Sequence, residues 1–181
     1  RLKRNLLKKY KLAPQTAKHV LALIKRLSNY ANKKHLCSPL KFPVEFPKVD
    51  NAKTEDLTSD QLSSLMAVLK IETNIQVRNL MYLALYTGMR RSELFELQWT
   101  DIDFSNGFIL IREPKGGKSE KIPLNKEART VLENHEKPFP DSLYIFPGIK
   151  GQKRCDIKRV VNRIKKEAGL PKDFRPLHGL R

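Results

Sequence analysis

Three prolines, Pro39, Pro43 and Pro47, interrupt the chain and divide it into two parts. Proline lacks the backbone N–H that a helix or a central strand requires, so we expect no regular element to run through this stretch. The apolar residues between the prolines alternate, which is typical of an extended segment lying on a surface. We therefore predict a linker at residues 37–57 between two folding units, residues 1–36 and 58–181.

The first part contains one clear helix, which the sequence predicts from Pro14 onward. Pro14 suits the first turn of a helix, where its missing N–H costs no hydrogen bond. Apolar residues follow at steps of three and four, the spacing of one helix face. They are Ala17, Val20, Leu21, Ile24, Leu27 and Ala31. A single helix cannot bury such a stripe by itself, so we expect it to pack on other helices.

The second part begins with two signals for helix starts. Thr58 with Gln61 fits a capping box, and Thr73 with Gln76 repeats the pattern. The helix after the second signal is apolar on most sides, so we predict that it is the central helix of the core. Gly88 is expected to end it in the left-handed conformation that favours glycine. A short helix should follow.

The hydrophobic period then changes from helical to β-like. Residues 101–104, 107–111 and 121–124 are short β-rich runs separated by glycine-containing turns, which predicts a three-stranded antiparallel sheet. Helical patterns return at 125–132 and 157–168. The predicted fold class is mainly α with a small antiparallel β-sheet, an α+β fold.

The charge of the chain points to a polyanionic partner. Its 181 residues carry 36 Lys and Arg against 19 Asp and Glu, a formal net charge of +17. Residues 1–44 contain twelve basic residues and no acidic one, which favours a nucleic-acid partner over a solubilising surface. Cys37 and Cys155 give no disulfide framework and no zinc spacing, which fits a reducing cytoplasm. The sequence contains no stretch long and apolar enough to predict a membrane span.

Two short motifs hold the residues best suited to grip a phosphate. One is Thr-Gly-Met-Arg-Arg-Ser-Glu-Leu at 87–94, and the other is His-Gly-Leu-Arg at 178–181. Arginine donates two parallel hydrogen bonds and keeps its charge, and histidine donates to oxygen and shuttles protons near neutral pH. Taken alone, Arg90 also fits an ordinary surface arginine, and His178 a structural histidine. Their combination favours a phosphate site.

The two motifs resemble the arginine boxes of the tyrosine recombinases, the phage integrase family. The resemblance implies the DNA breaking–rejoining catalytic fold of that family, with Arg90, His178 and Arg181 as catalytic residues around one phosphate. By the same match, Arg91 points elsewhere and contacts the DNA backbone. Glu93 lies on the same helical face as Arg90 and is expected to support its guanidinium through a hydrogen-bonded pair.

The hairpin between the second and third predicted strands carries two lysines of interest, Lys115 and Lys118. A lysine at such a tip is most simply a solvated residue. The run from Pro114 to Leu124 resembles the hairpin-lysine motif of the same family, which makes Lys115 the catalytic candidate. A lysine in that position lends a proton to the leaving oxygen. Lys118 is the weaker catalytic candidate and is assigned to DNA binding.

The resemblance covers residues 58–181, which we interpret as a catalytic domain truncated before its nucleophile. Residues 1–36 then correspond to a C-terminal helical remnant of the core-binding domain that clamps DNA. The family's nucleophilic tyrosine should lie beyond Arg181, so we expect this fragment to be inactive alone. The chain also begins with Arg1 and not with Met, as a fragment would.

The resemblance further implies site-specific DNA recombination, either integration or excision, by strand cleavage and rejoining through a 3′-phosphotyrosyl intermediate. That chemistry needs no cofactor and no metal, and no small-molecule substrate is expected. The expected partner is double-stranded DNA, bound by a homo-tetramer. The expected location is the bacterial cytoplasm, with the nucleoid.

Two other functions remain open from the sequence. A non-catalytic DNA-binding module would explain the charge, and a type IB topoisomerase shares the same chemistry. An RNA-binding protein is disfavoured, because the sequence shows no aromatic stacking motif. Of the remaining aromatic and imidazole groups, Tyr82 and Tyr86 are interpreted as packing residues, and His135 as an ordinary surface or helix residue.

Overall fold

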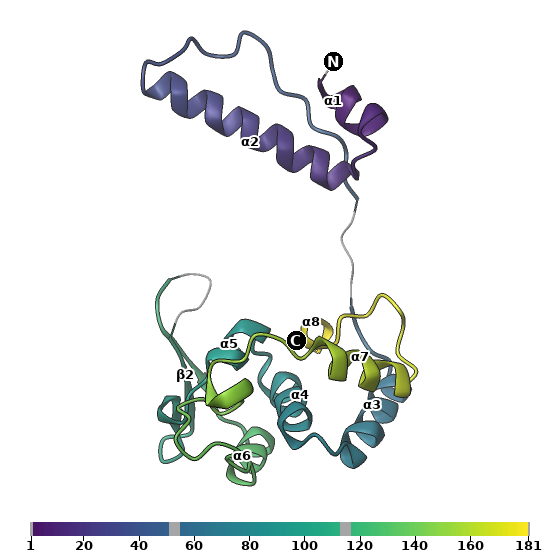
Figure 1. Cartoon of the computed structure of the whole chain (residues 1–181), viewed down its shortest axis with the longest axis vertical. Coiled ribbons are helices and arrows are strands. Elements are labelled where there is room, and N and C mark those ends of the chain that lie inside the picture. The colour runs from purple at the N-terminus through teal and green to yellow at the C-terminus, as the bar shows by residue number, and fades with distance from the viewer. Residues whose placement is uncertain (1, 51–54, 113–116, 181) are drawn as a thin grey trace. The chain divides into compact units, whose positions relative to one another are not determined.

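The computed structural model describes residues 2–50, 55–112 and 117–180. Its contacts divide the chain into two compact units, Arg1–Lys53 and Thr54–Arg181. The two units are distinguished by colour in Figure 1, purple and dark blue for the first and teal to yellow for the second. No helix in the described part of the chain is both long enough and apolar enough to span a membrane.

The first unit consists of α1 (Leu2–Arg4), the π-helical turn η1 (Asn5–Lys9) and the long α2 (Pro14–Lys33). Pro14 lies in the first turn of α2, as predicted. After α2 the chain turns back and runs along the helix in an extended form (Figure 1), and Val44 packs against a small buried cluster. That cluster contains Leu6, Ala17 and Leu21.

The apolar stripe of α2 is buried only in its first half. Ala17 and Leu21 are buried, whereas Leu27 and Tyr30 are more than half exposed. The expectation that this helix packs on further helices, and the assignment of residues 1–36 to a core-binding domain, both stay predictions.

The second unit begins with the capping box predicted at Thr58. Its hydroxyl accepts the N–H of Gln61 at 3.2 Å, and the Gln61 side chain accepts the N–H of Thr58 at 3.0 Å. This cap begins α3 (Ser59–Ile71). Because both bonds satisfy N–H groups that lack partners inside the helix, the boundary follows from local sequence.

The cap of α4 (Ile75–Thr87) differs from the prediction. Asn74, and not Thr73, is the N-cap, and its side chain accepts the N–H of Val77 at 3.1 Å. The carboxylate of Glu72 accepts the N–H of Asn74 at 2.8 Å and holds the turn one residue further along. Asparagine caps a helix at least as well as threonine, so this contact decides between two acceptable residues.

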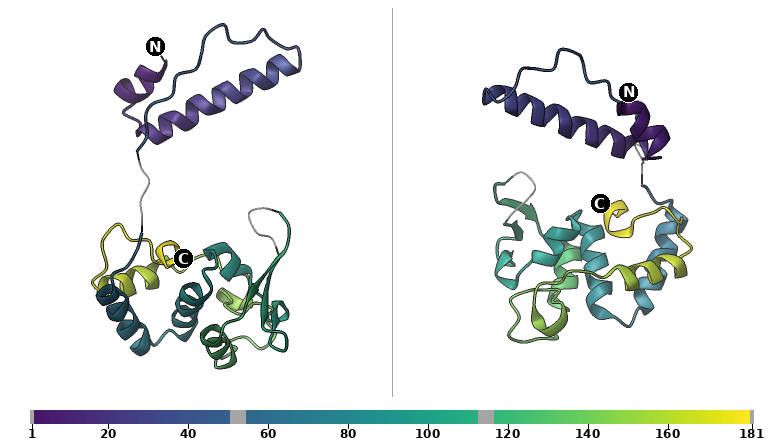
Figure 2. Two further views of the ribbon diagram at one scale, coloured as in Figure 1. Left: turned by 180° about the vertical axis from the view of Figure 1, so that it is seen from behind. Right: turned by 45° about the horizontal axis from the view of Figure 1, so that its top comes forward.

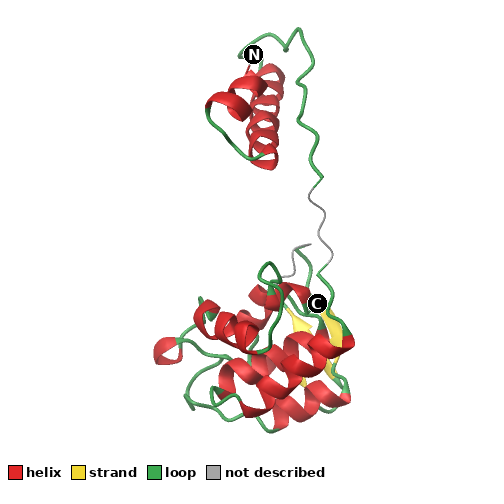
Figure 3. Cartoon of the chain, turned by 90° about the vertical axis from the view of Figure 1, so that its right-hand side faces the viewer, coloured by secondary structure: helices red, strands yellow, loops and turns green. Residues whose placement is uncertain are grey.

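The small sheet follows the short helix α5 (Arg91–Glu96) and the 3₁₀ turn η2 (Trp99–Asp101). It consists of β1 (Ile102–Asp103), β2 (Phe108–Ile111) and β3 (Glu120–Pro123), in the order β1-β2-β3 and antiparallel throughout. The strands are the yellow arrows in Figure 3. The predicted three-stranded antiparallel sheet is confirmed.

Helices make up the rest of the second unit. They are α6 (Lys126–Glu133), the turn η3 (Ile149–Gly151), α7 (Lys158–Glu167) and α8 (Pro176–Gly179). The central α4 packs on α6, while α3 packs beside α7, as the views in Figures 1 and 2 show. The interior of α4 is buried on several sides, so its prediction as the core helix is confirmed, together with the mainly-α fold class.

His135 is not the ordinary surface or helix residue that the sequence indicated, because only 6% of it is exposed. Its Nδ1 lies 2.9 Å from the side-chain nitrogen of Asn79, and its Nε2 lies 2.9 Å from the carbonyl oxygen of Ile145. A neutral ring with its proton on Nε2 satisfies both contacts. The Phe146 ring packs edge-on against the imidazole at 4.9 Å. The helical period hid this residue because it lies just beyond the end of α6.

We predict that the second unit loses stability in mild acid because of His135. Burial lowers the pKa of this imidazole, and the charge of Arg78 adds to that effect, while the Ile145 carbonyl and Glu136 oppose it. As the pH falls below the ordinary histidine value of about 6.5, the unfolded chain binds a proton that the folded chain does not bind. The free energy of unfolding then decreases by at most about 1.4 kcal/mol per pH unit. Chemical denaturation between pH 7 and pH 5 measures the loss.

The matched variants are His135→Gln and His19→Gln, the second at an exposed histidine. The first should flatten the pH dependence and the second should leave it intact. An unchanged slope in His135→Gln would contradict the prediction.

Candidate functional site

One cleft of about 680 Å³ in the second unit brings the two arginine-box segments together. Its walls come from the start of α5, from α7 and from the segment leading into α8. Arg90 and His178 both line it, although they lie far apart in the sequence. These two residues, one from each motif, therefore lie in the same cleft, as the sequence predicts.

The position of Arg90 follows from the way α4 ends. Gly88 is the C-cap of α4 and adopts a left-handed conformation with φ of 65°. Its N–H donates a hydrogen bond to the carbonyl oxygen of Ala84 at 3.0 Å. Met89 is then buried, and Arg90 becomes the N-cap of α5. A residue with a Cβ is strained at such a φ, so glycine permits the sharp change of direction that brings Arg90 to the cleft.

Glu93 fixes Arg90 from the interior side. Its carboxylate accepts two hydrogen bonds from Arg90, one from the guanidinium Nη1 and one from the backbone N–H, each at 2.7 Å. The Glu93 side chain is 6% exposed and the Arg90 side chain is 39% exposed. The contact predicted between these residues is present, and it leaves part of the guanidinium open to the cleft. Charge-assisted bonds of this length are among the stronger ones in proteins.

Arg91 also lines the cleft and is exposed. Its guanidinium lies over the ring of Phe95 at 5.9 Å, on its own helix. The ring holds the side chain without using its hydrogen-bond donors, so these donors stay available to an anion. The assignment of Arg91 to DNA binding stays a prediction.

His178 lies on α8, a helix of a single turn. The turn starts at the buried Pro176, and Gly179 packs so closely on the ring of Phe174 that an added Cβ would lie 2.3 Å from it. Glycine is therefore required for close approach at this position. The contact explains why the second residue of the His-Gly-Leu-Arg motif is glycine: it allows the α8 turn to pack against the ring of Phe174.

Several residues of the cleft were missed by the sequence reasoning. Lys158, Asn162 and Lys165 line it from α7, and Lys172 and Arg175 line it from the loop that follows. The signal was present, because the three α7 residues have the i, i+4, i+7 spacing of one helix face. That face was overlooked because the neighbouring apolar face of α7 had defined the helix.

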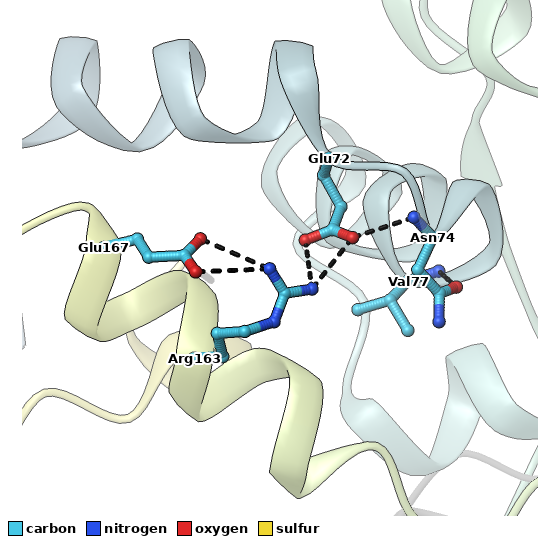
Figure 4. Close-up of polar contacts among 5 residues, drawn as sticks. All are labelled: Glu72, Asn74, Val77, Arg163 and Glu167. Atoms are coloured by element: carbon cyan, nitrogen blue, oxygen red, sulfur yellow. Dashed lines mark hydrogen bonds and ion pairs between the residues drawn. The ribbon is translucent and has the colours of Figure 1, made fainter.

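An ion pair between a buried carboxylate and a half-exposed arginine holds α7 in place (Figure 4). The Glu72 carboxylate, only 1% exposed, accepts Nη2 of Arg163 at 2.8 and 3.0 Å, and Nη1 of the same guanidinium reaches Glu167. Glu72 lies at the end of α3, and Arg163 lies on α7. The pair therefore ties the α7 wall of the cleft to the helix beside it.

Lys115 and Arg181 lie outside the described residues. Lys118 is exposed and is not among the residues that line the cleft. In the described ranges, no group of three His, Cys, Asp or Glu side chains is arranged to hold a metal ion.

Residues 55–181 match the model of the phage integrase family. The chain belongs to this family. Its curated relatives include tyrosine recombinase XerA of Pyrococcus furiosus, which is 32% identical over 125 residues, covering 68% of this chain and 43% of the relative. The shufflon-specific DNA recombinase of Escherichia coli is 35% identical over 94 residues, covering 50% of this chain and 24% of that protein. This phage integrase family member thus spans less than half the length of these relatives.

Solved structures show the same fold. The Tn1549 transposon integrase in complex with circular intermediate DNA gives a TM-score of 0.76 at 22% identity, covering 99% of this chain and 68% of that one. A lambda integrase tetramer bound to a Holliday junction gives 0.74 at 19% identity, covering 98% and 56%. The predicted family and its DNA breaking–rejoining fold are therefore confirmed for this integrase family chain.

We predict that Arg163→Ala destabilises the second unit more than its control variant does, because it leaves the Glu72 carboxylate buried without its cation. The solvent-exposed end of Arg163 keeps the loss below that of a fully buried pair. Glu133→Ala is the control, since it breaks the exposed pair with Arg129 and should cost less than about 0.5 kcal/mol. Equal unfolding midpoints for the two variants in urea would refute the role of the Glu72 pair.

Proposed function

We propose that this chain is the DNA-binding and phosphate-activating part of a site-specific recombinase that cuts and rejoins DNA through a 3′-phosphotyrosyl intermediate. The observation that carries the proposal is the single cleft shared by Arg90 and His178 in a member of the phage integrase family. The net charge of +17 supports duplex DNA as the substrate. The lambda integrase tetramer on a Holliday junction supports a homo-tetramer on DNA.

In the proposed reaction Arg90 and His178 donate hydrogen bonds to the non-bridging oxygens of the scissile phosphate. Attack on phosphorus increases the negative charge on these oxygens, so fixed donors stabilise the transition state more than the ground state. Arg181 adds a second guanidinium, by its match to the family motif. Glu93 keeps Arg90 oriented, so that no reorganisation is needed during the reaction.

The proposed nucleophile is a tyrosine that follows Arg181 in a longer chain. The tyrosine oxygen loses its proton to water as it bonds to phosphorus, the bond between phosphorus and the 5′ oxygen breaks, and the 5′ oxygen takes a proton from Lys115. The phosphotyrosyl bond keeps the energy of the phosphodiester, so a 5′ hydroxyl of another strand can reverse the step and join new ends. Arg91 and Lys118 are assigned to the neighbouring DNA backbone.

We predict that Arg90→Ala weakens binding of duplex DNA about tenfold, since it removes one charge-assisted bond to a phosphate. The slope of log affinity against log salt should fall by about one, as expected for one lost phosphate contact. Filter binding at several salt concentrations measures both quantities. Lys70→Ala is the control, because Lys70 is an exposed lysine that does not line the cleft. Equal losses in both variants would contradict a specific role for Arg90.

We also predict that Glu93→Gln weakens binding while leaving the salt slope unchanged. Removing a negative charge beside Arg90 would by itself strengthen phosphate binding, so a loss must come from a misoriented guanidinium. We expect a decrease of about threefold, in the same filter-binding assay. An increase in affinity would show that Glu93 only neutralises Arg90.

In a longer chain that carries the tyrosine, Arg90→Ala and Arg181→Ala should each abolish covalent attachment to a suicide DNA substrate. Attachment at the wild-type rate in either variant would refute the assignment of that residue. Relaxation of plasmids without a specific site would favour a type IB topoisomerase, and absence of attachment in the unsubstituted chain would favour a non-catalytic DNA-binding module.

A further inference from the structure

Glu55 makes a close contact with the segment that carries His178. Its carboxylate accepts the guanidinium Nε–H of Arg175 at 2.5 Å and the backbone N–H of the same residue at 3.2 Å. The two residues are far apart in the sequence, and both belong to the second unit. The side chain of Glu55 is 8% exposed, so this carboxylate is shielded from water, whereas the Arg175 side chain is 61% exposed.

Arg175 in turn begins the helix that holds His178. It is the N-cap of α8, and its carbonyl oxygen accepts the N–H of His178 at 2.8 Å and the N–H of Gly179 at 2.7 Å. The Glu55 carboxylate grips this residue by its backbone as well as its side chain. The position of the α8 turn is thereby linked to Glu55 through a single residue, Arg175.

Glu55 lies shortly before a packed part of the second unit. Leu57 packs against the core of the second unit, and Thr58 is the N-cap of α3. Glu55 is therefore only two residues from a packed side chain and three from a helix cap. A one-turn helix such as α8 gains little stability from its own hydrogen bonds, so contacts of this kind decide its orientation.

We infer that Glu55 is a positioning residue for His178: by holding Arg175 at the start of α8, it fixes the turn that presents the imidazole to the cleft. The function of that imidazole rests on the proposed reaction, whereas the contact itself does not. Glu55 does not itself line the cleft and acts through Arg175, which does.

Hydrogen exchange of the 181-residue chain without DNA tests the contact. Glu55→Ala should speed exchange at the amides of His178 and Gly179 at least about tenfold, because the anchor of the turn is lost. Amides inside α4 should be unaffected, which separates local release from unfolding. Glu133→Ala, which removes another paired glutamate, is the control and should change neither region. Unchanged exchange at His178 and Gly179 in Glu55→Ala would overturn the inference.

A pH titration adds a measurement that does not depend on folding of the alanine variant. Burial raises the pKa of Glu55, but the hydrogen bonds and charge of Arg175, with the charge of His178, outweigh it and hold the pKa below its ordinary value. The contact is therefore complete at neutral pH and is lost as the pH falls through the lowered pKa. The amide shift of Gly179 should follow this titration in the wild-type chain and not in Glu55→Gln. Persistence of the inflection in Glu55→Gln would count against the contact.

A double-mutant cycle on duplex-DNA binding tests the link to His178. Glu55→Ala should lower affinity about threefold in the wild-type chain and have no such effect in His178→Ala. Additive losses would overturn the positioning role. Failure of the proposed function appears differently, as DNA binding that is insensitive to Arg90→Ala, and it leaves the hydrogen-exchange result untouched.

Discussion

The cleft depends on one recurrent interaction, a nearly buried carboxylate that holds a partly exposed arginine. Glu93 holds Arg90 in this way, Glu72 holds Arg163, and Glu55 holds Arg175. In each pair the carboxylate is at most 8% exposed and the arginine at least 39% exposed. A carboxylate removed from water has few alternative partners, so it fixes the guanidinium more firmly than a surface acid would.

Each of these three pairs fixes a different part of the cleft. The Glu93 pair orients a residue of the α5 wall, the Glu72 pair ties the α7 wall to α3, and the Glu55 pair anchors the turn of α8. Acidic side chains used in this way are turned inward, and the basic excess of the chain remains on the outside. The arrangement suits a surface that must attract a polyanion without letting its own arginines move freely.

Much of the local structure could be predicted from the sequence. The starts of α2, α3 and α6 and the end of α4 follow from proline, capping residues and glycine, whose effects act over a few bonds. The prediction at Thr73 was wrong because two adjacent residues are both good caps, and a contact from Glu72 chose between them. His135 was misread because burial depends on Asn79 and Ile145, neither of which is near it in the sequence.

By itself the sequence determined the fold class, the family and the two motifs that hold Arg90 and His178. These depend on periodicity, caps and short strings of residues, which local physics controls. Only the tertiary structure decided that Arg90 and His178 line one cleft, that α7 supplies one of its walls, and that Glu55 grips Arg175. Such contacts join segments separated by most of a domain, and packing of the shared core, which no local pattern specifies, sets which of them meet.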